Sequence, residues 1–391
     1  MNKQDWTYKK LGEVAQSELG KTLNSSKDKG ELYPYLCAVN VLWDKIDTAT
    51  LKETRFEESE LERYSVHKGD LLVCEGGDIG RAAIWDKEQP IQYQNALHRV
   101  RFNDEVLPRF CLMYLRCLKE KGVIDGRYGK GVTIKHLVKS SLLSIPIPIP
   151  PMAVQERIVA ELDLLSGIID KKKEQLKAYD QLAQSIFYTM FGDPIDNPKG
   201  WETKKLGEVC HCITDGDHMP PPKSDEGIPF LTISNVNKDK RELDFSNTFF
   251  VPREYYDNLK DERKARINDL LYTVTGSYGI PVIVRSSRPF CFQRHIALLR
   301  PIQETVLTSF LFNWALCPSV KEEADNVATG IAQKTVGLNS LRQFSVILPP
   351  LSLQQEFAEK VESIERQKAL IRQSIDEVQT MFDYTMDKYF G

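Results

Sequence analysis

The sequence predicts an α+β protein in which two similar mixed α/β domains are separated by two long, antiparallel coiled-coil helices. Three observations support this prediction. Sequence segments recur at intervals of nearly 200 residues, a mixed pattern of short apolar runs fills the first part of each copy, and a heptad pattern fills the last part. Together they indicate a pseudo-twofold internal repeat, because a period of this length is far longer than that of a solenoid.

The repeat is visible in matched motifs along the whole chain. The first pair lies 195 residues apart and the others lie 199 apart. The pairs are Trp6…Leu11-Gly-Glu-Val14 with Trp201…Leu206-Gly-Glu-Val209, Gly77-x-x-Gly80 with Gly276-x-x-Gly279, Pro150-Pro151…Gln155 with Pro349-Pro350…Gln354, and Phe191-Gly192 with Phe390-Gly391. These motifs divide the chain into a domain at 1–150, a helix at 151–192, a domain at 193–349 and a helix at 350–391.

Each predicted domain mixes strands, a helix and a proline-rich end. In the first copy, residues 70–74 and 97–102 are apolar runs typical of strands, and 107–121 predict a helix with proline near its start. Alternating prolines in 145–151 exclude a helix and favour an edge strand. The second copy predicts strands near 269–274 and 281–285, a helix near 306–317, and the same extended end at 344–350.

The two helices carry matching narrow apolar seams. Steps of four and three residues alternate along each, which is the a/d pattern of a coiled coil. The predicted seam residues are Ile158, Leu162, Leu165, Ile169 and Leu176, then Phe357, Val361, Ile364, Ile371, Ile375, Val378 and Phe382. We expect the helices to pack on each other and not to lie as separate surface helices, which usually show a wider stripe. Lys172 and Lys368 interrupt the seams, and we expect both to extend towards solvent.

Composition limits the class of protein. The net charge of −3 argues against a non-specific coat on nucleic acid, which needs a broadly positive surface, but it permits a reader with clustered lysine and arginine. Eight cysteines form no CxxC pair and are expected as reduced, buried thiols. No apolar run is long enough to span a membrane and no signal peptide is evident, so we expect a cytoplasmic protein.

No catalytic constellation emerges from the sequence. Gly126-Arg-Tyr-Gly-Lys-Gly131 lacks the spacing of a phosphate-binding loop, and no HExxH or Asn-Pro-Pro-Tyr tetrad is present. Cys210-His-Cys212 and Asp215-Gly-Asp-His218 could supply metal ligands, but the first copy offers nothing similar at either place. The sequence therefore predicts no metal site and no catalysis in this chain.

Several loops recur at equivalent places with different side chains, which is expected of two readers on one scaffold. Glycines after a strand allow a phosphodiester backbone to approach, asparagine and glutamine pair with adenine, and arginine pairs with guanine. The candidates for DNA binding in the first copy are Lys21, Asn24, Ser25, Lys27, Gly77, Arg81, Tyr93, Gln94, Asn95, Arg127, Lys130 and Lys135. In the second copy they are Ser277, Tyr278, Gln293, Arg294, His295 and Lys334.

The ordered set of motifs resembles the specificity subunits of type I restriction–modification systems. The motifs concerned are Trp6…Leu-Gly-Glu-Val14, Ile147-Pro-Ile-Pro-Pro151…Gln155, their copies, and Met190-Phe-Gly-Asp-Pro…Trp201. The glutamate usual before that glutamine is replaced by Val154 and Leu353. The resemblance implies two target-recognition domains, each reading half of a split site in double-stranded DNA, and two conserved spacer helices.

The resemblance also implies partners. Two modification subunits would bind S-adenosylmethionine and methylate adenine, and restriction subunits that use ATP can join them. This chain would hold no cofactor. A different class stays open on the residues alone: a coiled-coil adaptor that binds proteins through the same loops.

Overall fold

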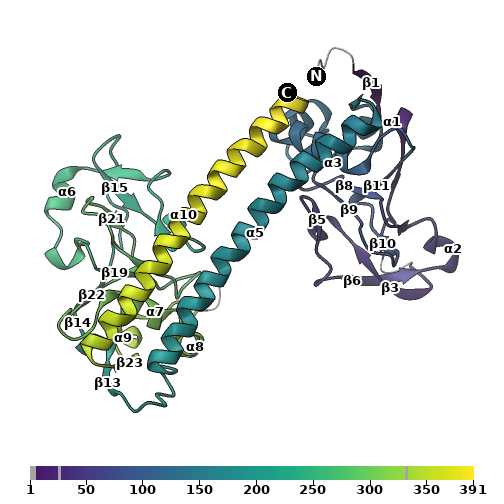
Figure 1. Cartoon of the computed structure of the whole chain (residues 1–391). Coiled ribbons are helices and arrows are strands. Elements are labelled where there is room, and N and C mark those ends of the chain that lie inside the picture. The colour runs from purple at the N-terminus through teal and green to yellow at the C-terminus, as the bar shows by residue number, and fades with distance from the viewer. Residues whose placement is uncertain (1–5, 25–27, 331–332) are drawn as a thin grey trace. The chain divides into compact units, whose positions relative to one another are not determined.

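The computed structural model describes residues 6–24, 28–330 and 333–391. Its contacts divide the chain into two compact units. Unit 1 comprises Met1–Lys172 and Ser374–Gly391, and unit 2 comprises Lys173–Gln373. Each unit therefore holds one mixed domain together with part of each long helix, α5 (Met152–Phe191) and α10 (Leu351–Phe390), both labelled in Figure 1. Among the described residues, no helix is long and apolar enough to cross a membrane.

The domain of unit 1 is built from short strands and three compact sheets, with a small two-stranded turn. Its strands are β1 (Thr7–Lys10), β2 (Ala15–Leu19), β3 (Glu31–Leu36), β4 (Val41–Leu42), β5 (Lys45–Ile46), β6 (Lys52–Phe56), β7 (Ser65–Val66), β8 (Leu71–Cys74), β9 (Ala82–Ile84), β10 (Ile91–Tyr93), β11 (Leu97–Phe102) and β12 (Pro146–Ile149). Its helices are α1 (Leu11–Val14), α2 (Glu58–Leu61), α3 (Pro108–Glu120) and α4 (Lys139–Leu143). A 3-10 turn, η2 (Ala38–Asn40), and a π-helical turn, η3 (Ile124–Tyr128), complete it.

Two four-stranded sheets dominate this domain, in the orders β2-β11-β8-β9 and β6-β3-β10-β7. Strand β10 runs parallel to β3, whereas the other pairings are antiparallel. The proline-rich strand β12 pairs only with β1, in a two-stranded sheet. An edge position suits β12 because proline has no amide hydrogen to donate to a second neighbour.

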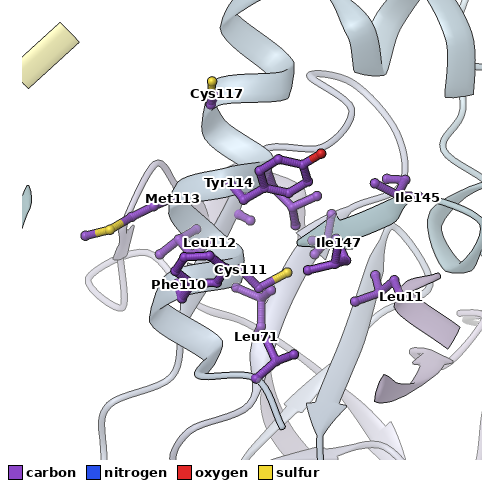
Figure 2. Packing of buried hydrophobic residues seen from close by; sticks show 14 of the residues in the cluster. Leu11, Leu71, Phe110, Cys111, Leu112, Met113, Tyr114, Cys117, Ile145 and Ile147 are labelled. Carbon is purple, nitrogen blue, oxygen red and sulfur yellow. The ribbon is translucent and has the colours of Figure 1, made fainter. Parts of the chain in front are cut away.

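The main core of unit 1 lies between helix α3, the sheets and the two long helices. Figure 2 shows Leu71 of β8 packed with Phe110 and Cys111 of α3, and with Ile147 of β12. Helix α3 begins at a proline, whose fixed φ and missing amide hydrogen suit the first helical turn. The same core takes in residues of both long helices, namely Ile158, Leu162 and Leu165 of α5 with Phe382, Met386 and Tyr389 of α10. The start of α5 therefore packs beside the end of α10, so these helices run antiparallel here.

The domain of unit 2 repeats this plan. Its strands are β13 (Glu202–Lys205), β14 (Cys210–Asp215), β15 (Ile228–Leu231), β16 (Val236–Asn237), β17 (Glu242–Leu243), β18 (Phe249–Val251), β19 (Leu270–Thr273), β20 (Pro281–Ile283), β21 (Cys291–Phe292), β22 (Ile296–Pro301) and β23 (Ser345–Leu348). Its helices are α6 (Arg253–Asp257), α7 (Thr308–Ala315), α8 (Pro318–Val327) and α9 (Leu338–Leu341), with 3-10 turns η4 (Leu206–Glu208), η5 (Ile233–Asn235) and η6 (Asp261–Arg263).

The sheet order β14-β22-β19-β20 matches β2-β11-β8-β9 of unit 1, and β13-β23 matches β1-β12. Four phenylalanines, Phe187 and Phe191 of α5, Phe310 of α7 and Phe357 of α10, form the centre of the core, with ring centroids 4.9–5.6 Å apart. Here the end of α5 packs beside the start of α10. The α+β class, the two similar domains and the antiparallel long helices predicted from the sequence are thus confirmed.

A buried glutamine fixes the start of each long helix to its domain. The amide of Gln155 accepts a hydrogen bond from Leu107 N at 2.9 Å and donates to the carbonyls of Glu105 and Pro150 at 2.8 and 3.0 Å. Gln354 makes the equivalent bonds to Leu307 N, Thr305 O and Pro349 O at 2.9, 3.2 and 2.8 Å. Because both side chains are fully buried, each would leave several backbone groups unsatisfied if it were removed. This explains physically why the glutamine after each proline pair recurs.

The seam residues differ in burial along the helices. Most of the buried seam residues enter the domain cores, whereas Ile169 and Ile364 are buried outside these cores and the remaining seam residues are half-buried. The buried ones are Ile158, Leu162, Leu165, Ile169, Phe357, Ile364 and Phe382, and the half-buried ones are Leu176, Val361, Ile371, Ile375 and Val378. The domains thus stabilise the ends of both helices.

One expectation about the seam is wrong. Lys368 does not extend to solvent: it is 5% exposed, and its Nζ lies 2.7 Å from Asp180 Oδ1 of α5 and 2.6 Å from Glu365 Oε1. Two carboxylates compensate its charge, so burial is tolerated. Lys172, by contrast, is half-buried.

Candidate nucleic-acid interface

Four loops of unit 1 are joined edge to edge by backbone hydrogen bonds, and we call them loop frame 1. They are residues 20–24, 75–80, 94–96 and 130–136. Lys21 N donates to Tyr93 O and Asn95 N donates to Lys21 O, both at 3.0 Å. Glu75 N donates to Ala96 O at 2.9 Å, and Leu137 N donates to Glu75 O at 2.7 Å. The four loops therefore form one continuous edge of the domain.

Unit 2 contains the same arrangement, loop frame 2, formed by residues 216–218, 275–279, 293–295 and 329–335. Asp217 N donates to Phe292 O at 2.9 Å, Arg294 N to Asp217 O at 3.1 Å, Val274 N to His295 O at 2.9 Å, and Val336 N to Val274 O at 2.8 Å. The backbone bonds correspond one to one, although most loop side chains differ. Residues 331 and 332 of the last loop lie outside the described residues.

A glycine makes the closest approach in each frame possible. A Cβ on Gly20 would lie 2.4 Å from the backbone of Gln94, and one on Gly216 would lie 1.8 Å from Phe292 O. Both distances are far inside van der Waals contact, so no other residue fits without moving the loop. The first loop of each frame is held against the third by this contact.

Beneath loop frame 1, Lys21 forms a buried ion pair. Its side chain is 6% exposed, and its Nζ lies 2.6 Å from Glu60 Oε2 and 2.8 Å from Arg55 O. Burial alone would raise the pKa of Glu60, but the hydrogen bond and charge of Lys21 hold that pKa below its usual range. The ammonium group is thus already neutralised inside the domain.

The equivalent position in unit 2 carries the opposite charge. Asp217 is buried, with Arg263 Nη1 at 3.4 Å from its Oδ1. Burial raises the pKa of the Asp217 carboxyl, and a hydrogen bond from Tyr255 and the charge of Arg263 offset only part of that effect. The two frames share a backbone, but the charge beneath them is inverted.

The family of the chain follows from comparison with known proteins. The sequence profile of the type I restriction modification DNA specificity domain matches residues 3–178 and again residues 198–380. The chain belongs to this family. The two matched segments correspond to the two halves of the internal repeat.

Related proteins support this assignment along most of the chain. This chain is 25% identical over 338 residues to the type I restriction enzyme EcoBI specificity subunit of Escherichia coli, and the match covers 78% of this chain and 68% of that protein. It is 24% identical to the putative type I restriction enzyme MjaX specificity subunit of Methanocaldococcus jannaschii, over 93% of this chain and 87% of the relative. A crystal structure of the type I restriction–modification S subunit from M. genitalium shares the fold, with a TM-score of 0.54 at 15% identity over 99% of this chain and 96% of the other.

Specificity subunits are the non-catalytic members of type I restriction–modification systems, and as a family they recognise DNA targets and assemble with modification and restriction subunits. Within the described part of this chain, no group of three or more histidine, cysteine or acidic side chains could hold a metal ion. The pair Asp215 and His218 is instead bonded internally at 2.8 Å. All eight cysteines are free thiols, and seven of them are buried.

The candidate residues predicted from the sequence divide into three groups. Gln94, Asn95, Gln293, Arg294 and His295 lie together in the third loops of the two frames, where they are half-buried or exposed. The amide of Asn95 donates to Thr22 Oγ1 at 3.2 Å, so this side chain also links the first and third loops of frame 1. Burial, followed by the neighbouring charge of Arg294, lowers the pKa of His295, which favours its neutral form.

A second group lies in the second and fourth loops or directly before or after them, as Arg127 does in the turn η3. Arg127, Lys130 and Lys334 are exposed, while Lys135 donates to Asp125 O at 2.8 Å. Gly77 and Ser277 are exposed, and Tyr278 donates to Asp325 Oδ1 at 2.5 Å. Arg81 donates to Ala38 O at 2.8 Å and thus ties the second loop to the domain.

The third group, Lys21 and Tyr93, is unsuited to contact DNA in this geometry. Lys21 is buried and ion-paired, and Tyr93 is fully buried with its hydroxyl bonded to Glu18 O at 3.2 Å. We therefore assign both to the support of the frame, which corrects their selection from the sequence. Asn24 is exposed, while Ser25 and Lys27 lie outside the described residues.

Several residues that the structure brings to these frames are not marked by any sequence pattern. Glu60 and Arg263 come from distant segments to neutralise Lys21 and Asp217. Only the folded sheets bring these charges together, because the partners are separated by 39 and 46 positions.

Proposed function

We propose that this chain reads a DNA target in two parts, one with each loop frame, and directs partner adenine methyltransferase subunits to it. The observation that carries the proposal is the one-to-one match of backbone hydrogen bonds between the frames, combined with different side chains on them. A protein that reads one half-site twice would keep the side chains as well as the backbone. Here the backbone repeats and the chemistry differs.

The third loops offer the side chains best suited to read bases. Gln94 and Asn95 can pair bidentately with adenine, while Arg294 can pair with the O6 and N7 of guanine in the major groove. Each good bidentate pair discriminates by about 1–3 kcal/mol. We propose these residues, with Gln293 and His295, as base contacts.

Exposed cations in and just before the fourth loops suit the phosphate backbone. We propose that Lys130 of frame 1, Lys334 of frame 2 and Arg127 of the neighbouring turn η3 contact phosphates and position the domains on DNA without reading sequence. The whole chain carries a net charge of −3, so few counterions would be released by it alone. We therefore expect partner subunits to supply much of the positive surface.

The division into recognition domains at 1–150 and 193–349, and spacer helices at 151–192 and 350–391, is part of this proposal. Two modification subunits would bind the helices and domains, and restriction subunits can join them. S-adenosylmethionine and ATP would be held by those partners and not by this chain. A chain with this role acts in the cytoplasm, where the DNA is.

Sequencing of methylated adenines in the host genome, with and without this gene, tests the proposal. We expect one two-part motif, containing a methylated adenine in each part, to disappear when the gene is deleted. Reintroduction of the gene should restore it. An unchanged methylation pattern, together with a purified complex that does not retain DNA, would favour a protein-binding adaptor instead.

A further inference from the structure

The fourth loop of frame 1 ends in an exposed apolar tip that the proposed function does not explain. Val132 is 99% exposed and Ile134 is 66% exposed, with the exposed Thr133 between them. Single exposed apolar residues are common on protein surfaces. Two exposed apolar residues on the tip of one short loop indicate a contact surface more strongly when the loop is held in a defined conformation.

The fourth loop of frame 1 has such a defined conformation. Lys130 N donates to His136 O at 2.8 Å and His136 N donates to Lys130 O at 2.7 Å, which closes a narrow two-stranded hairpin. Gly131 has φ +109°, and a Cβ there would lie 2.2 Å from Ile134 O. Only glycine permits this turn, so the backbone of the tip is fixed although its side chains are exposed.

The base of the hairpin is fixed to the rest of frame 1. His136 Nδ1 lies 3.0 Å from Glu75 Oε2, and Lys135 donates to Asp125 O at 2.8 Å. The next residue, Leu137, is bonded to Glu75 O at 2.7 Å. The tip is therefore held beside the loops that carry the proposed base contacts.

Unit 2 repeats the backbone of this hairpin. Thr329 and Thr335 exchange hydrogen bonds of 3.0 and 2.7 Å, and Gly330 has φ +117° with a Cβ position 2.2 Å from Gln333 O. Gln333 is exposed and stands where unit 1 has Ile134, so a polar side chain replaces an apolar one at this position. Ile331 matches Val132 in the sequence and lies outside the described residues.

We propose, on the basis of the DNA-reading function above, that Val132 and Ile134 read thymine methyl groups in the major groove of the half-site bound by unit 1. A two-stranded ribbon fits the major groove, and only thymine presents a methyl group there. Lys130 at the base of the hairpin and Arg127 in the turn just before it are exposed and match the phosphates that line this groove. A protein partner is less suited, because the tip is narrow and bordered by cations.

Replacement of thymine by deoxyuridine tests the contact, since it removes one methyl group and leaves base pairing unchanged. The complex of the full chain with its methyltransferase partner would be bound to duplexes in which each thymine of the mapped target is replaced in turn. We expect replacement at one or two positions of the first half-site to weaken binding about fourfold, the value of one buried methyl group. A thymine is present there opposite the adenine proposed for methylation.

The double variant Val132→Ser, Ile134→Ser should bind the natural target more weakly and lose all dependence on those methyl groups. Folding should be unaffected, because the side chains are exposed. Leu42→Ser, which changes another exposed apolar residue of unit 1, is the matched control and should keep the dependence.

Three results would overturn the inference. They are equal sensitivity to deoxyuridine in the wild-type and double-variant complexes, weaker binding by the variant with no thymine dependence in the wild type, and failure of the variant to assemble with the methyltransferase. Failure of the proposed function would look different, because the wild-type complex would then select no two-part target at all.

Discussion

The two loop frames share a backbone but invert the charge beneath it. Lys21 is neutralised by Glu60 under frame 1, whereas Asp217 lies near Arg263 under frame 2. The backbone bonds at the two positions are the same, since each residue donates to the strand before the third loop and accepts from the loop itself. The frame is therefore specified by main-chain bonding and glycine, and its side chains are free to change, even in sign.

The turn that attaches each domain to helix α5 also carries opposite charges in the two units. In unit 1, Asp44, with φ +60°, is ion-paired with Arg109, which also binds Asp163 of α5 at 2.6 Å. In unit 2, the equivalent turn places Arg241, with φ +52°, 3.6 Å from Asp180 of α5. Each turn reaches a carboxylate of the helix, through an intermediate arginine in one case and directly in the other.

The largest effects should come from the glycines that close the frames. Gly20→Ala would force the first loop of frame 1 away from Gln94, and Gly216→Ala would do the same in frame 2, because clashes with backbone atoms cannot be relieved by a change of rotamer. We expect each variant to lose selectivity in its own half-site and to retain the other. Target selection from a randomised DNA pool would measure this, and loss of the same half-site in both variants would contradict it.

A smaller effect is expected from the ion pairs beneath the frames. Glu60→Gln leaves the buried Lys21 with Asp28, 3.5 Å from its Nζ, as the remaining carboxylate, and should destabilise unit 1 by about 1–3 kcal/mol. Arg263→Gln should cost less than about 1 kcal/mol, because Arg263 is one-third exposed and its contact is long. Urea unfolding followed by hydrogen exchange would assign each loss to its unit. Equal losses would show that the two pairs are energetically alike.

The smallest effect should be a difference in how Glu60 and Asp217 make the stability of the folded protein depend on pH. The pKa of Glu60 is lowered, so the stabilisation from its pair is present above its usual pKa of 4.5 and is lost as pH falls through the folded value. The pKa of Asp217 is raised above 3.8, so ionised Asp217 opposes folding, and acidification through its folded pKa relieves that cost. The two groups should therefore contribute slopes of opposite sign.

The slopes can be separated by comparing Glu60→Gln and Asp217→Asn with the wild type in urea titrations between about pH 3 and 6. Glu60→Gln should flatten the loss of stability on acidification, and Asp217→Asn should steepen it. Changes of the same sign in both variants would contradict the assignment of these pockets.

The sequence predicted the scaffold well because the scaffold depends on local patterns. Heptad spacing specified α5 and α10, alternating prolines specified β12, and the recurring glutamines marked the helix starts. Whether a lysine side chain is buried or exposed could not be predicted from local patterns. Lys21 and Lys368 are buried because Glu60 and Asp180, remote in sequence, meet them in the folded chain. A candidate site chosen by residue type alone therefore included a lysine that supports the frame and omitted the apolar tip of the hairpin.

The central claim, that each frame reads its own half of the target, is tested most directly by one matched pair of variants. Asn95→Ala and Arg294→Ala remove the third-loop side chains at equivalent positions of the two frames. Target selection with each purified complex should show one half-site relaxed in the first variant and the other half-site relaxed in the second, with about 1–3 kcal/mol of discrimination lost at the affected base pair. Uniform weakening on all sequences, or relaxation of the same half-site by both variants, would contradict the claim.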